Sequence, residues 1–455
     1  MTQRADVVAF DSDNGDGRWL LRGVRPLGAA AVDMLLAGPV IVEVGPGLCA
    51  PGAEVLDADG LIALPGLVDL HTHLREPGRE DAETVASGTR AAALGGFTTV
   101  FAMANTEPVA DTAGVVEQVW RLGQAAGHCD VRPVGAVTEG LRGTRLAELG
   151  AMASSAAAVR VFSDDGNCVS DAVLMRRALE YVKAFDGVIA QHAQEPRLTE
   201  DAQMNEGAVS ARLGLLGWPA AAEEAIIARD ALLAGHVGSR LHVCHVSTAG
   251  SVEILRWAKS KGWRVTAEVT PHHLLLTDEL ATTYDPVYKV NPPLRTAIDV
   301  EALRAGLADG TIDCIATDHA PHAPQDKETE WAAARPGMLG LETALSIAIM
   351  TMVETGLLDW AGLADRMAGA PGRIGGLPAG HSARSTYGSW DTAGALSAGA
   401  AANVVLVDPA ARWTVDPATC ASRSRNTPYA GRNLPGRVQA TFLRGRPTVL
   451  DGKIV

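Results

Sequence analysis

The feature that most constrains the fold is a rhythm of short apolar runs, each followed by a longer segment with helical spacing. Eight of these runs predict strands, at 67–72, 98–103, 131–135, 158–162, 187–191, 240–245, 264–269 and 313–317. The clearest helices are expected at 80–96, 171–185, 220–235 and 251–262, and the signal is weakest for the third helix and after the seventh strand. Strand-then-helix units filling residues 64–375 predict an α/β protein, a (β/α)8 barrel whose active site lies where the strands end.

The two flanks of the barrel differ from it, because they carry short strand-like runs without helical spacing. These runs occupy much of residues 1–63 and 376–455. Neither flank holds enough strands for a sandwich of its own, so we expect them to pair into one small, discontinuous β-sandwich domain. Residues 382–399 are rich in Ser, Gly and Ala and predict an insertion or exposed loop in the second flank.

Composition limits the partners and the compartment. The 455 residues carry a formal net charge of −14, which argues against a surface for nucleic acid or for an anionic membrane. No apolar stretch approaches the ~18 residues of a membrane span, and the first residues lead into no signal-peptide core, so a cytoplasmic protein is expected. Six scattered cysteines without a C-x-x-C pair fit reduced, packed thiols.

The first predicted strand runs directly into two histidines. Because residues two apart on a strand face the same side, Asp69, His71 and His73 are expected to project into the barrel together. His-x-His at the end of a strand is half of a metal site. Taken alone, the pair also fits a buried, hydrogen-bonded couple, so the interpretation depends on the other strand ends.

Three further strands stop at ionisable residues. Strand five ends on His192, strand six on His245 and strand eight on Asp318. Because the strands of a barrel end at one mouth, these side chains and the first-strand histidines are expected to gather there. Nitrogen and carboxylate ligands in such a set suit Zn²⁺ or a similar divalent ion.

Other histidines fit structural roles better. By strand parity, His242 points with Cys244 toward the outer helices, and His319 faces away from the neighbouring Asp318. His272 and His273 follow strand seven, where they could either be structural or support the metal ligands.

Several motifs of the sequence resemble those of a known family. The motifs DLHTHLREPG (69–78), GGFTTVFAMANTEP (95–108), FSDDG (162–166), HVCHVST (242–248), EVTPHHL (268–274), KVNPPLR (289–295) and IATDHAPH (315–322) are similar to those of bacterial class I dihydroorotases in the amidohydrolase superfamily. The resemblance covers roughly residues 55–455. It implies reversible, zinc-dependent ring closure of N-carbamoyl-L-aspartate to L-dihydroorotate, a step of pyrimidine synthesis.

The resemblance also implies a ligand set. His71, His73 and Asp318 would hold one zinc, His192 and His245 a second, and Asp165 would bridge the two; one or two ions are open, with two favoured. Many relatives bridge their metals with a carboxylated lysine on strand four. The matching position here is Arg160, which cannot be carboxylated because it stays protonated. Asp165 is therefore expected to supply the bridging anion.

The remaining implied roles concern substrate. Asp318 would act as the acid and base that exchanges a proton with the attacking water and the ring nitrogen. The substrate carboxylate and ring amide would be held by six residues, namely Arg75, Asn105, Asn291, His322, Gly337 and Met338. Ala104 replaces a proline usual in the family without removing a functional group. The charged segment 323–337 fits either a mobile gate or an ordinary solvated loop.

Two other functions would share part of this pattern. A dihydropyrimidinase, hydantoinase or allantoinase would share the histidines but should carry the strand-four lysine. An inactive scaffold for aspartate carbamoyltransferase should have lost metal ligands, and none is missing here. An active enzyme could still bind the carbamoyltransferase, and a homo-oligomer is expected.

Overall fold

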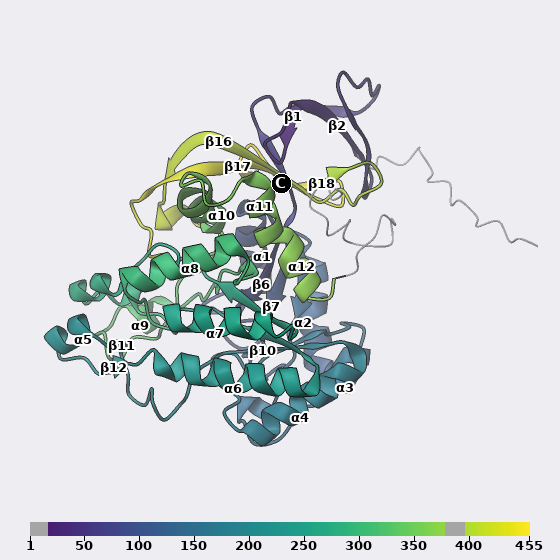
Figure 1. Cartoon of the computed structure of the whole chain (residues 1–455). Helices are drawn as coiled ribbons and strands as arrows, with labels where there is room; N and C mark the ends of the chain where they lie inside the picture. Colours follow the sequence, from purple (N-terminus) through teal and green to yellow (C-terminus); the bar gives the residue numbers. More distant parts are fainter. Residues whose placement is uncertain (1–16, 378–395) are drawn as a thin grey trace, which may run out of the picture.

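The computed structural model describes residues 17–377 and 396–455. Its larger part is a ring of eight parallel strands surrounded by helices (Figure 1). The strands of the ring are β6 (Leu67–Thr72), β7 (Phe97–Ala102), β8 (Asp130–Pro133), β9 (Val161–Phe162), β10 (Val188–Gln191), β13 (Arg240–Val243), β14 (Val265–Val269) and β15 (Cys314–Ile315). Each of the eight predicted strands is thus confirmed, with ends that differ by a few residues.

Single bridges close the ring where regular pairing stops. Strands β6, β7 and β8 form one parallel sheet, and β9, β10, β13, β14 and β15 form another. A bridge from Gly135 to Phe162 joins β8 to β9, and a bridge from Thr72 to His319 joins β6 to the end of β15. The (β/α)8 barrel predicted from the sequence is therefore the observed architecture.

The helices follow the predicted order. Their bounds are α1 (Val85–Leu94), α2 (Ala113–Ala126), α3 (Leu149–Ser154), α4 (Ala172–Val182), α5 (Ala208–Leu213), α6 (Ala221–Val237), α7 (Ala249–Ser260), α8 (Ala297–Asp309), α9 (Pro324–Lys327), α10 (Ala344–Ala348), α11 (Trp360–Ala364) and α12 (Ala370–Ile374). The two weakest regions of the prediction are also the least regular. Helix α3 is a short element, and the chain after β14 makes 3-10 turns before α8, while β11 (Met204–Asn205) and β12 (Gly217–Trp218) pair outside the ring.

The first helix begins later than its pattern suggested. Thr84 caps α1, because its hydroxyl accepts a hydrogen bond from the Ser87 backbone N–H at 3.1 Å and the Ser87 hydroxyl accepts one from the Thr84 N–H. This reciprocal capping box fixes the start of the helix at Val85. Residues 80–83 are left as a loop at the barrel mouth, and Glu83 is fully buried in it.

The apolar core of the barrel has two layers. The outer layer lies between strands and helices and includes Leu67, Phe162 and Ile189. The inner layer fills the barrel and groups Val68 and Leu70 of β6 with residues at the ends of other strands, such as Cys244 after β13 and Ala316 after the neighbouring β15. Helix α12 contributes Ala370 and Ile374 to this inner layer. The interior is therefore packed, and the polar residues of the barrel collect at its open end.

Both flanks form one β domain, as expected. Its strands are β1 (Arg18–Pro26), β2 (Val32–Ala37), β3 (Val40–Gly45), β4 (Glu54–Asp57), β5 (Ile62–Pro65), β16 (Val404–Thr414), β17 (Asn433–Leu443), β18 (Arg446–Leu450) and β19 (Lys453–Ile454). Strand β16 pairs antiparallel with β5, which joins the two ends of the chain in a nine-stranded sheet (Figure 1). Trp19 packs edge-on against Phe442 with ring centroids 5.5 Å apart, so the sheet encloses its own core.

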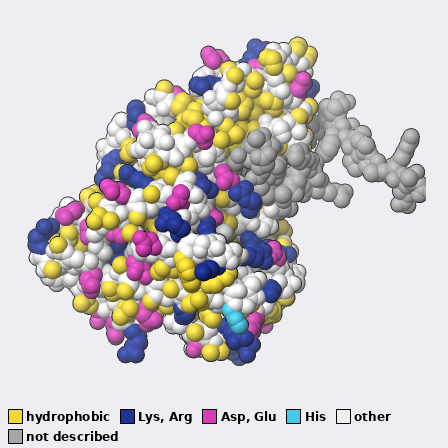
Figure 2. All heavy atoms as spheres, viewed as in Figure 1, with side chains coloured by type: hydrophobic (Ala, Val, Ile, Leu, Met, Phe, Trp, Pro, Cys, Tyr) yellow, Lys and Arg dark blue, Asp and Glu magenta, His cyan; other side chains and the backbone are white. Residues whose placement is uncertain are grey.

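The surface of the barrel carries charges of both signs, and part of the second flank can be compared with its prediction. Figure 2 shows acidic and basic side chains intermingled on the face that helices α6 and α7 cover. Among residues 17–377 and 396–455, no helix has the length and hydropathy to cross a membrane. Most of the predicted insertion, residues 382–395, lies outside the described residues. In its last part, Leu396 is buried in the core of the β domain, whereas Ala398 is exposed.

Candidate active site

One carboxylate lies at the centre of the histidine cluster. Asp165 follows β9, and its Oδ1 is 3.3 Å from His71 Nε2, 3.2 Å from His192 Nδ1 and 3.2 Å from His245 Nε2. Its Oδ2 is 3.3 Å from His73 Nε2. All five side chains are buried. Asp165 is thus the member shared by two groups of potential metal ligands, one with the β6 histidines and one with His192 and His245.

Asp318 completes the first of these groups. Its Oδ1 lies 3.1 Å from His73 Nε2 and 3.6 Å from His71 Nε2. Asp318 and His245 both have positive φ angles, 46° and 30°, a conformation that L-residues seldom adopt. Backbone strain of this kind is characteristic of functional sites. It turns both side chains toward the same point as the β6 histidines.

The donor spacing fits zinc. Nitrogen and oxygen ligands bound at 2.0–2.2 Å in tetrahedral geometry lie about 3.3 Å from one another. The distances from Asp165 to His71, His192 and His245 are close to this value. Within the described residues, the buried Nε2 of His71 has no hydrogen-bond partner despite its polar surroundings. A buried nitrogen without a hydrogen-bond partner is well suited to bind a metal ion.

Neighbouring side chains fix the ring orientation of three histidines. Glu268 Oε1 lies 2.7 Å from His71 Nδ1, and Asn105 Oδ1 lies 2.9 Å from His73 Nδ1. Because these oxygens can only accept, each ring donates from Nδ1 and turns its Nε2 lone pair toward Asp165. His192 is held in the opposite sense, since its Nε2 lies 2.8 Å from Gln194 Oε1 and leaves Nδ1 for the cluster.

Glu268 and Gln194 are functional residues that the sequence analysis missed. A signal was available for Glu268, because an acid near the end of a predicted apolar strand would be buried and then needs a partner. For Gln194, two residues beyond His192, no periodicity indicates its role. Its Oε1 also accepts a hydrogen bond from Asn291 Nδ2 at 3.1 Å, so it connects a metal-ligand candidate with a substrate-binding candidate.

Electrostatics favour ionised carboxylates at this mouth. Burial alone would raise the pKa of Asp165, but His71, followed by His192 and His245, lowers it well below its usual value. The pKa of Asp318 is also lowered, against burial, chiefly by His73 and His71. Burial likewise opposes the charge of Glu268, yet His71 and His242 lower its pKa to about 2. Against burial, these carboxylates in turn raise the pKa of His71 and His192, so a bound cation would take the place of the histidine protons.

The position of Asp69 differs from the expectation. Strand β6 contains a bulge, because Asp69 pairs with Val100 and Thr72 with Ala102, three residues against two. The bulge breaks the alternation, so that Leu70 lies in the inner apolar layer and His71 still reaches the mouth. Asp69 Oδ1 instead accepts hydrogen bonds from the backbone N–H of His71 and of Thr317, both at 3.0 Å. It therefore stabilises the bulge and is not grouped with the histidines.

His242 and Cys244 also differ from the expectation, because they face the barrel interior. Cys244 packs with Val68 of β6, across the ring, and His242 Nε2 lies 3.0 Å from Glu268 Oε2. Regular strand structure ends at Val243, before the left-handed His245, so alternation does not carry from one histidine to the other.

Three further histidines lie near the mouth without joining the cluster. His319 turns toward Glu83, with Nε2 3.4 Å from its Oε2. His273 is held between Thr270 and the carbonyl of Pro292. His272 is buried, and burial lowers its pKa to about 4, so its ring is neutral. On strand four, Arg160 donates hydrogen bonds to the carbonyls of Ala153 and Val159, away from Asp165.

The predicted substrate residues lie around the same mouth. Arg75 follows the β6 histidines with a φ of 62° and donates from Nε to the Pro321 carbonyl at 3.1 Å. Burial lowers the pKa of Arg75 to about 10, and the Asp318 carboxylate opposes that shift, so the group stays cationic. His322 donates from Nε2 to the Pro336 carbonyl at 2.8 Å. The structure thus brings Arg75 and His322 to the edge of the cluster.

Most of the other residues predicted to bind substrate already form hydrogen bonds within the protein. Asn105 is tied to His73 and, through Nδ2, to the Asp165 carbonyl at 3.3 Å. Asn291 keeps a buried Oδ1 that has no partner among the described residues. The Gly337 N–H donates to the Lys289 carbonyl, and the Met338 carbonyl accepts from the Ala320 N–H. Met338 also packs its side chain into an apolar cluster beside the mouth.

The segment 323–337 packs on the barrel at two points. Lys327 Nζ donates to the carbonyls of Lys289 and Arg335, and Trp331 is buried against Met204. Exposed residues such as Glu328 and Glu330 lie between these points. The gate remains a prediction, because packing at two points restrains a loop without showing whether it moves.

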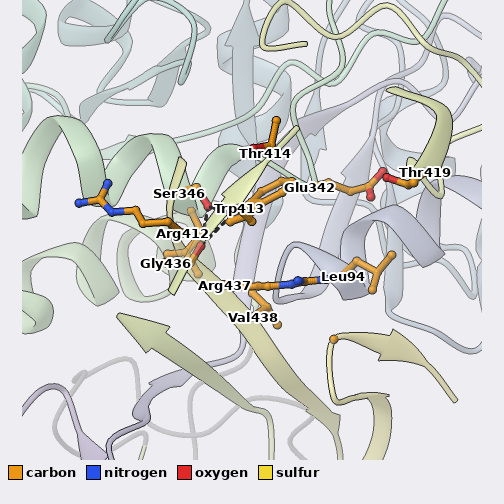
Figure 3. A pocket seen from close by; sticks show the side chains of 12 residues that line it. Leu94, Glu342, Ser346, Arg412, Trp413, Thr414, Thr419, Gly436, Arg437 and Val438 are labelled. Atoms are coloured by element: carbon orange, nitrogen blue, oxygen red, sulfur yellow. Dashed lines mark hydrogen bonds between the residues drawn. The ribbon is translucent and has the colours of Figure 1, made fainter. Parts of the chain in front are cut away.

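A separate cavity of about 480 Å³ lies at the junction of the barrel and the β domain. Figure 3 shows Trp413 and Arg437 of the β domain beside Glu342 and Leu94 of the barrel. None of the predicted site residues lines it. Glu342 Oε1 accepts hydrogen bonds from the backbone N–H of Ala421 and Ser422, which fixes the start of a chain segment that reaches the barrel mouth.

Comparison with known proteins agrees with this geometry. Residues 60–251 match the family model described as dihydro-orotase-like. The chain is 69% identical to a dihydroorotase of Streptomyces coelicolor and 57% identical to one of Mycobacterium tuberculosis, each over 96% of this chain and 99% of the relative.

Solved structures show the same fold at low sequence identity. An L-hydantoinase from Arthrobacter aurescens superimposes with a TM-score of 0.82 at 24% identity, covering 96% of this chain and 97% of that one. A dihydropyrimidinase from Brevibacillus agri gives a TM-score of 0.79 at 21% identity, with 96% of each chain covered. From the near full-length identity to its curated relatives, this chain belongs to the dihydroorotase family.

Proposed function

We propose that this chain is a dihydroorotase, which catalyses the reversible cyclisation of N-carbamoyl-L-aspartate to L-dihydroorotate in pyrimidine biosynthesis. The observation that carries the proposal is the convergence of four histidines and two aspartates on one mouth, directly beside the cationic Arg75. The histidines and aspartates can hold metal, and the arginine can hold a carboxylate. A cyclic amide that carries a carboxylate needs both.

His71, His73 and Asp318 are proposed to hold one Zn²⁺, His192 and His245 a second, and Asp165 to bridge them. Bound zinc would lower the pKa of an attacking water toward ~7 and polarise the amide carbonyl. The support for two ions is that Asp165 belongs to both groups of ligand candidates, with Oδ1 and Oδ2 facing different histidines. Arg160 supplies no alternative bridge, because its guanidinium bonds to carbonyls elsewhere.

Asp318 is the proposed catalytic acid and base. In the hydrolytic direction its carboxylate accepts a proton from the attacking water and returns it to the ring nitrogen as the C–N bond breaks. In the synthetic direction it takes the proton from the carbamoyl nitrogen and gives it to the departing water. The lowered pKa of Asp318 keeps its carboxylate ionised at neutral pH, the state that this role requires.

The substrate carboxylate is proposed to lie against Arg75, with Asn105 and His322 as further contacts. Arg75 suits this role because its planar fork can donate two parallel hydrogen bonds, and Nε already anchors it to the Pro321 carbonyl. Asn291 Oδ1, buried and unpaired within the described residues, is placed to accept from the ring amide. The backbone of Gly337 and Met338 closes this side of the mouth.

Two wider proposals follow from the family. We propose that the enzyme works in the cytoplasm as a homo-oligomer and that it can associate with an aspartate carbamoyltransferase, which makes its substrate. Sedimentation of the purified protein alone and mixed with the carbamoyltransferase tests both associations. A monomer in the first sample would contradict the homo-oligomer, and two proteins that sediment independently in the second would contradict the association.

The function is tested on purified protein by following both dihydroorotate hydrolysis and carbamoyl-aspartate cyclisation, with zinc counted in the same sample. We expect turnover in both directions with about two zinc ions per chain. Stoichiometric zinc without turnover would reject the substrate assignment. Hydantoin and dihydrouracil serve as control substrates, because they lack the carboxylate and should react far more slowly.

The gate is tested by limited proteolysis of the segment 323–337 with and without dihydroorotate. Ligand should slow cleavage between Lys327 and Trp331 if the segment closes over substrate. Equal cleavage rates would reject the gate.

A further inference from the structure

A short segment of the second flank contacts the barrel mouth. Residues 422–426, here called the strap, alternate strictly in exposure: Ser422, Ser424 and Asn426 are buried, whereas Arg423 and Arg425 are exposed. Such alternation is typical of an extended segment with one face against the protein. The buried face is small and polar, which suits contact with backbone and carboxylate groups more than packing in a core.

The first half of the strap contacts a carboxylate at the mouth. The Ser422 hydroxyl and the Arg423 N–H both donate to Glu83, and the Ser424 hydroxyl donates to the Ala82 carbonyl. Glu83 in turn faces His319 Nε2, and the His319 carbonyl accepts the His73 N–H at 2.8 Å. The strap is therefore linked through one buried acid to the residue next to Asp318.

The strap ends at Asn426, which uses both polar atoms of its side chain and its backbone carbonyl on the mouth. Its Oδ1 accepts from the His322 N–H at 3.2 Å, and its Nδ2 donates to the carbonyls of Ala320 at 3.0 Å and of Gly337 at 3.1 Å. Its own carbonyl accepts the Leu339 N–H at 3.1 Å. One buried side chain thus joins the segment after β15 to the segment around Gly337.

These two segments hold the predicted carboxylate-binding groups in close contact. A Cβ on Gly337, whose φ is 145°, would lie 2.6 Å from His322 Nε2, so only glycine permits this approach. Nε2 itself is bound to the Pro336 carbonyl. With its ring held on one side by residues 336–337 and its backbone held by Asn426, His322 has little freedom to move relative to Arg75.

We propose that Asn426 is a positioning residue for substrate binding, and that the strap completes the barrel mouth by setting the spacing of His322 and Gly337. It does not touch the reacting atoms. The proposal rests on the proposed function, because it assigns the strap to the carboxylate-binding side of that site. It also gives the discontinuous β domain a part in catalysis, since the strap lies between its strands β16 and β17.

The test compares Asn426→Ala and Asn426→Asp with the unmodified holoenzyme. Asn426→Asp keeps the acceptor for the His322 N–H and places an oxygen against the carbonyls of Ala320 and Gly337. Because sub-ångström misplacement of binding groups is costly, we expect both variants to raise the KM for dihydroorotate about tenfold or more while kcat changes less. Zinc content should stay at the level of the unmodified enzyme, since no zinc-ligand candidate bonds to Asn426.

The matched control is Asn433→Ala, an exposed asparagine at the start of β17 in the same domain, which should leave KM unchanged. A KM within twofold of the unmodified enzyme in folded, zinc-loaded Asn426 variants would overturn the proposal while the proposed function stands. Absence of turnover by the unmodified enzyme would overturn both.

Hydrogen exchange on the unmodified holoenzyme keeps the test valid if the variants do not fold. The backbone N–H groups of His322 and Leu339 donate to Asn426, so they report on the strap directly. Dihydroorotate should slow their exchange and that of residues 422–426 several-fold if the strap tightens on substrate. Unchanged exchange at saturating dihydroorotate would overturn the proposal.

Discussion

The two sides of the barrel mouth are built differently. On the metal side, the candidate ligands stand at the ends of β6, β10 and β13 or just after β9 and β15, and each of His71, His73 and His192 has one oxygen partner that fixes its ring. On the carboxylate side, Arg75 and His322 stand on loops and are held by backbone carbonyls and by Asn426. The first arrangement depends on strands that are rigid in themselves, and the second on contacts between distant segments.

This difference predicts which property a substitution on each side should change. A change on the metal side should lower metal affinity or the chemical step, because ligand geometry and proton transfer are set there. A change on the carboxylate side should raise KM, because it alters how substrate is held while the ligands stay in place. The following variants test that division, from the largest expected effect to the smallest.

Asp318→Asn should have the largest effect. The amide cannot accept the proton of the attacking water, and loss of a general acid and base costs on the order of 10²–10⁴-fold in kcat. Steady-state kinetics of dihydroorotate hydrolysis measure it. Glu330→Gln, an exposed change in the segment 323–337, is the control and should match the unmodified enzyme. A kcat within tenfold of normal would place the acid and base elsewhere.

Glu268→Gln should weaken zinc binding about 10- to 100-fold, because the acceptor for His71 loses its charge and the ring becomes a poorer ligand. Zinc affinity is measured by competition with a chelator. His242→Gln is the matched comparison, since it alters the other contact of the same carboxylate and leaves His71 Nδ1 bound. Equal losses in the two variants would show that Glu268 supports the barrel interior and not the ligand specifically.

Arg75→Lys should raise the KM for dihydroorotate about tenfold and leave zinc content unchanged, because lysine keeps the charge but loses the planar pair of donors. The control is Arg121→Lys, an exposed arginine paired with Glu117 on α2. A fall in zinc content with unchanged KM would show that Arg75 supports metal binding, and would contradict the division between the two sides.

Lys327→Met should flatten the pH dependence of stability, besides removing the hydrogen bonds of Nζ to the carbonyls of Lys289 and Arg335. Burial lowers the pKa of Lys327 to about 7 from 10.5, so between these values the unfolded chain binds more protons than the folded one and stability rises with pH. Removing the amine should flatten that rise by at most about 1.4 kcal/mol per pH unit. Denaturant unfolding at pH 7 to 10 measures the slope, and identical slopes in both proteins would refute a buried neutral amine.

The sequence predicted the metal side better than the carboxylate side. All eight strands and the gathering of His71, His73, His192, His245 and Asp318 could be predicted, because strand periodicity and the common end of parallel strands are local, repeated rules. The roles of Asp165 and of the substrate-binding residues were implied by the resemblance to the family. Single-strand parity failed at Asp69 and His242, since a bulge and the left-handed His245 interrupt the alternation.

The long-range contacts could not be predicted. Glu268 meets His71 from a strand 197 residues further along, and Asn426 meets His322 from 104 residues away. Nothing in the local pattern of either segment specifies its partner, because side-chain hydrogen bonds leave no periodic trace in a sequence. The strap is likewise too short for its alternation of Ser422, Ser424 and Asn426 with arginines to specify what it contacts.

The most direct test of this account is the zinc content of Asp165→Ala measured together with its rate of dihydroorotate hydrolysis. Because Asp165 is shared by both groups of ligand candidates, we expect bound zinc to fall from about two ions per chain to one or fewer, and the rate to fall by at least about 10²-fold. Two bound ions and an unchanged rate would contradict the account, because the bridging anion would then have to come from another residue.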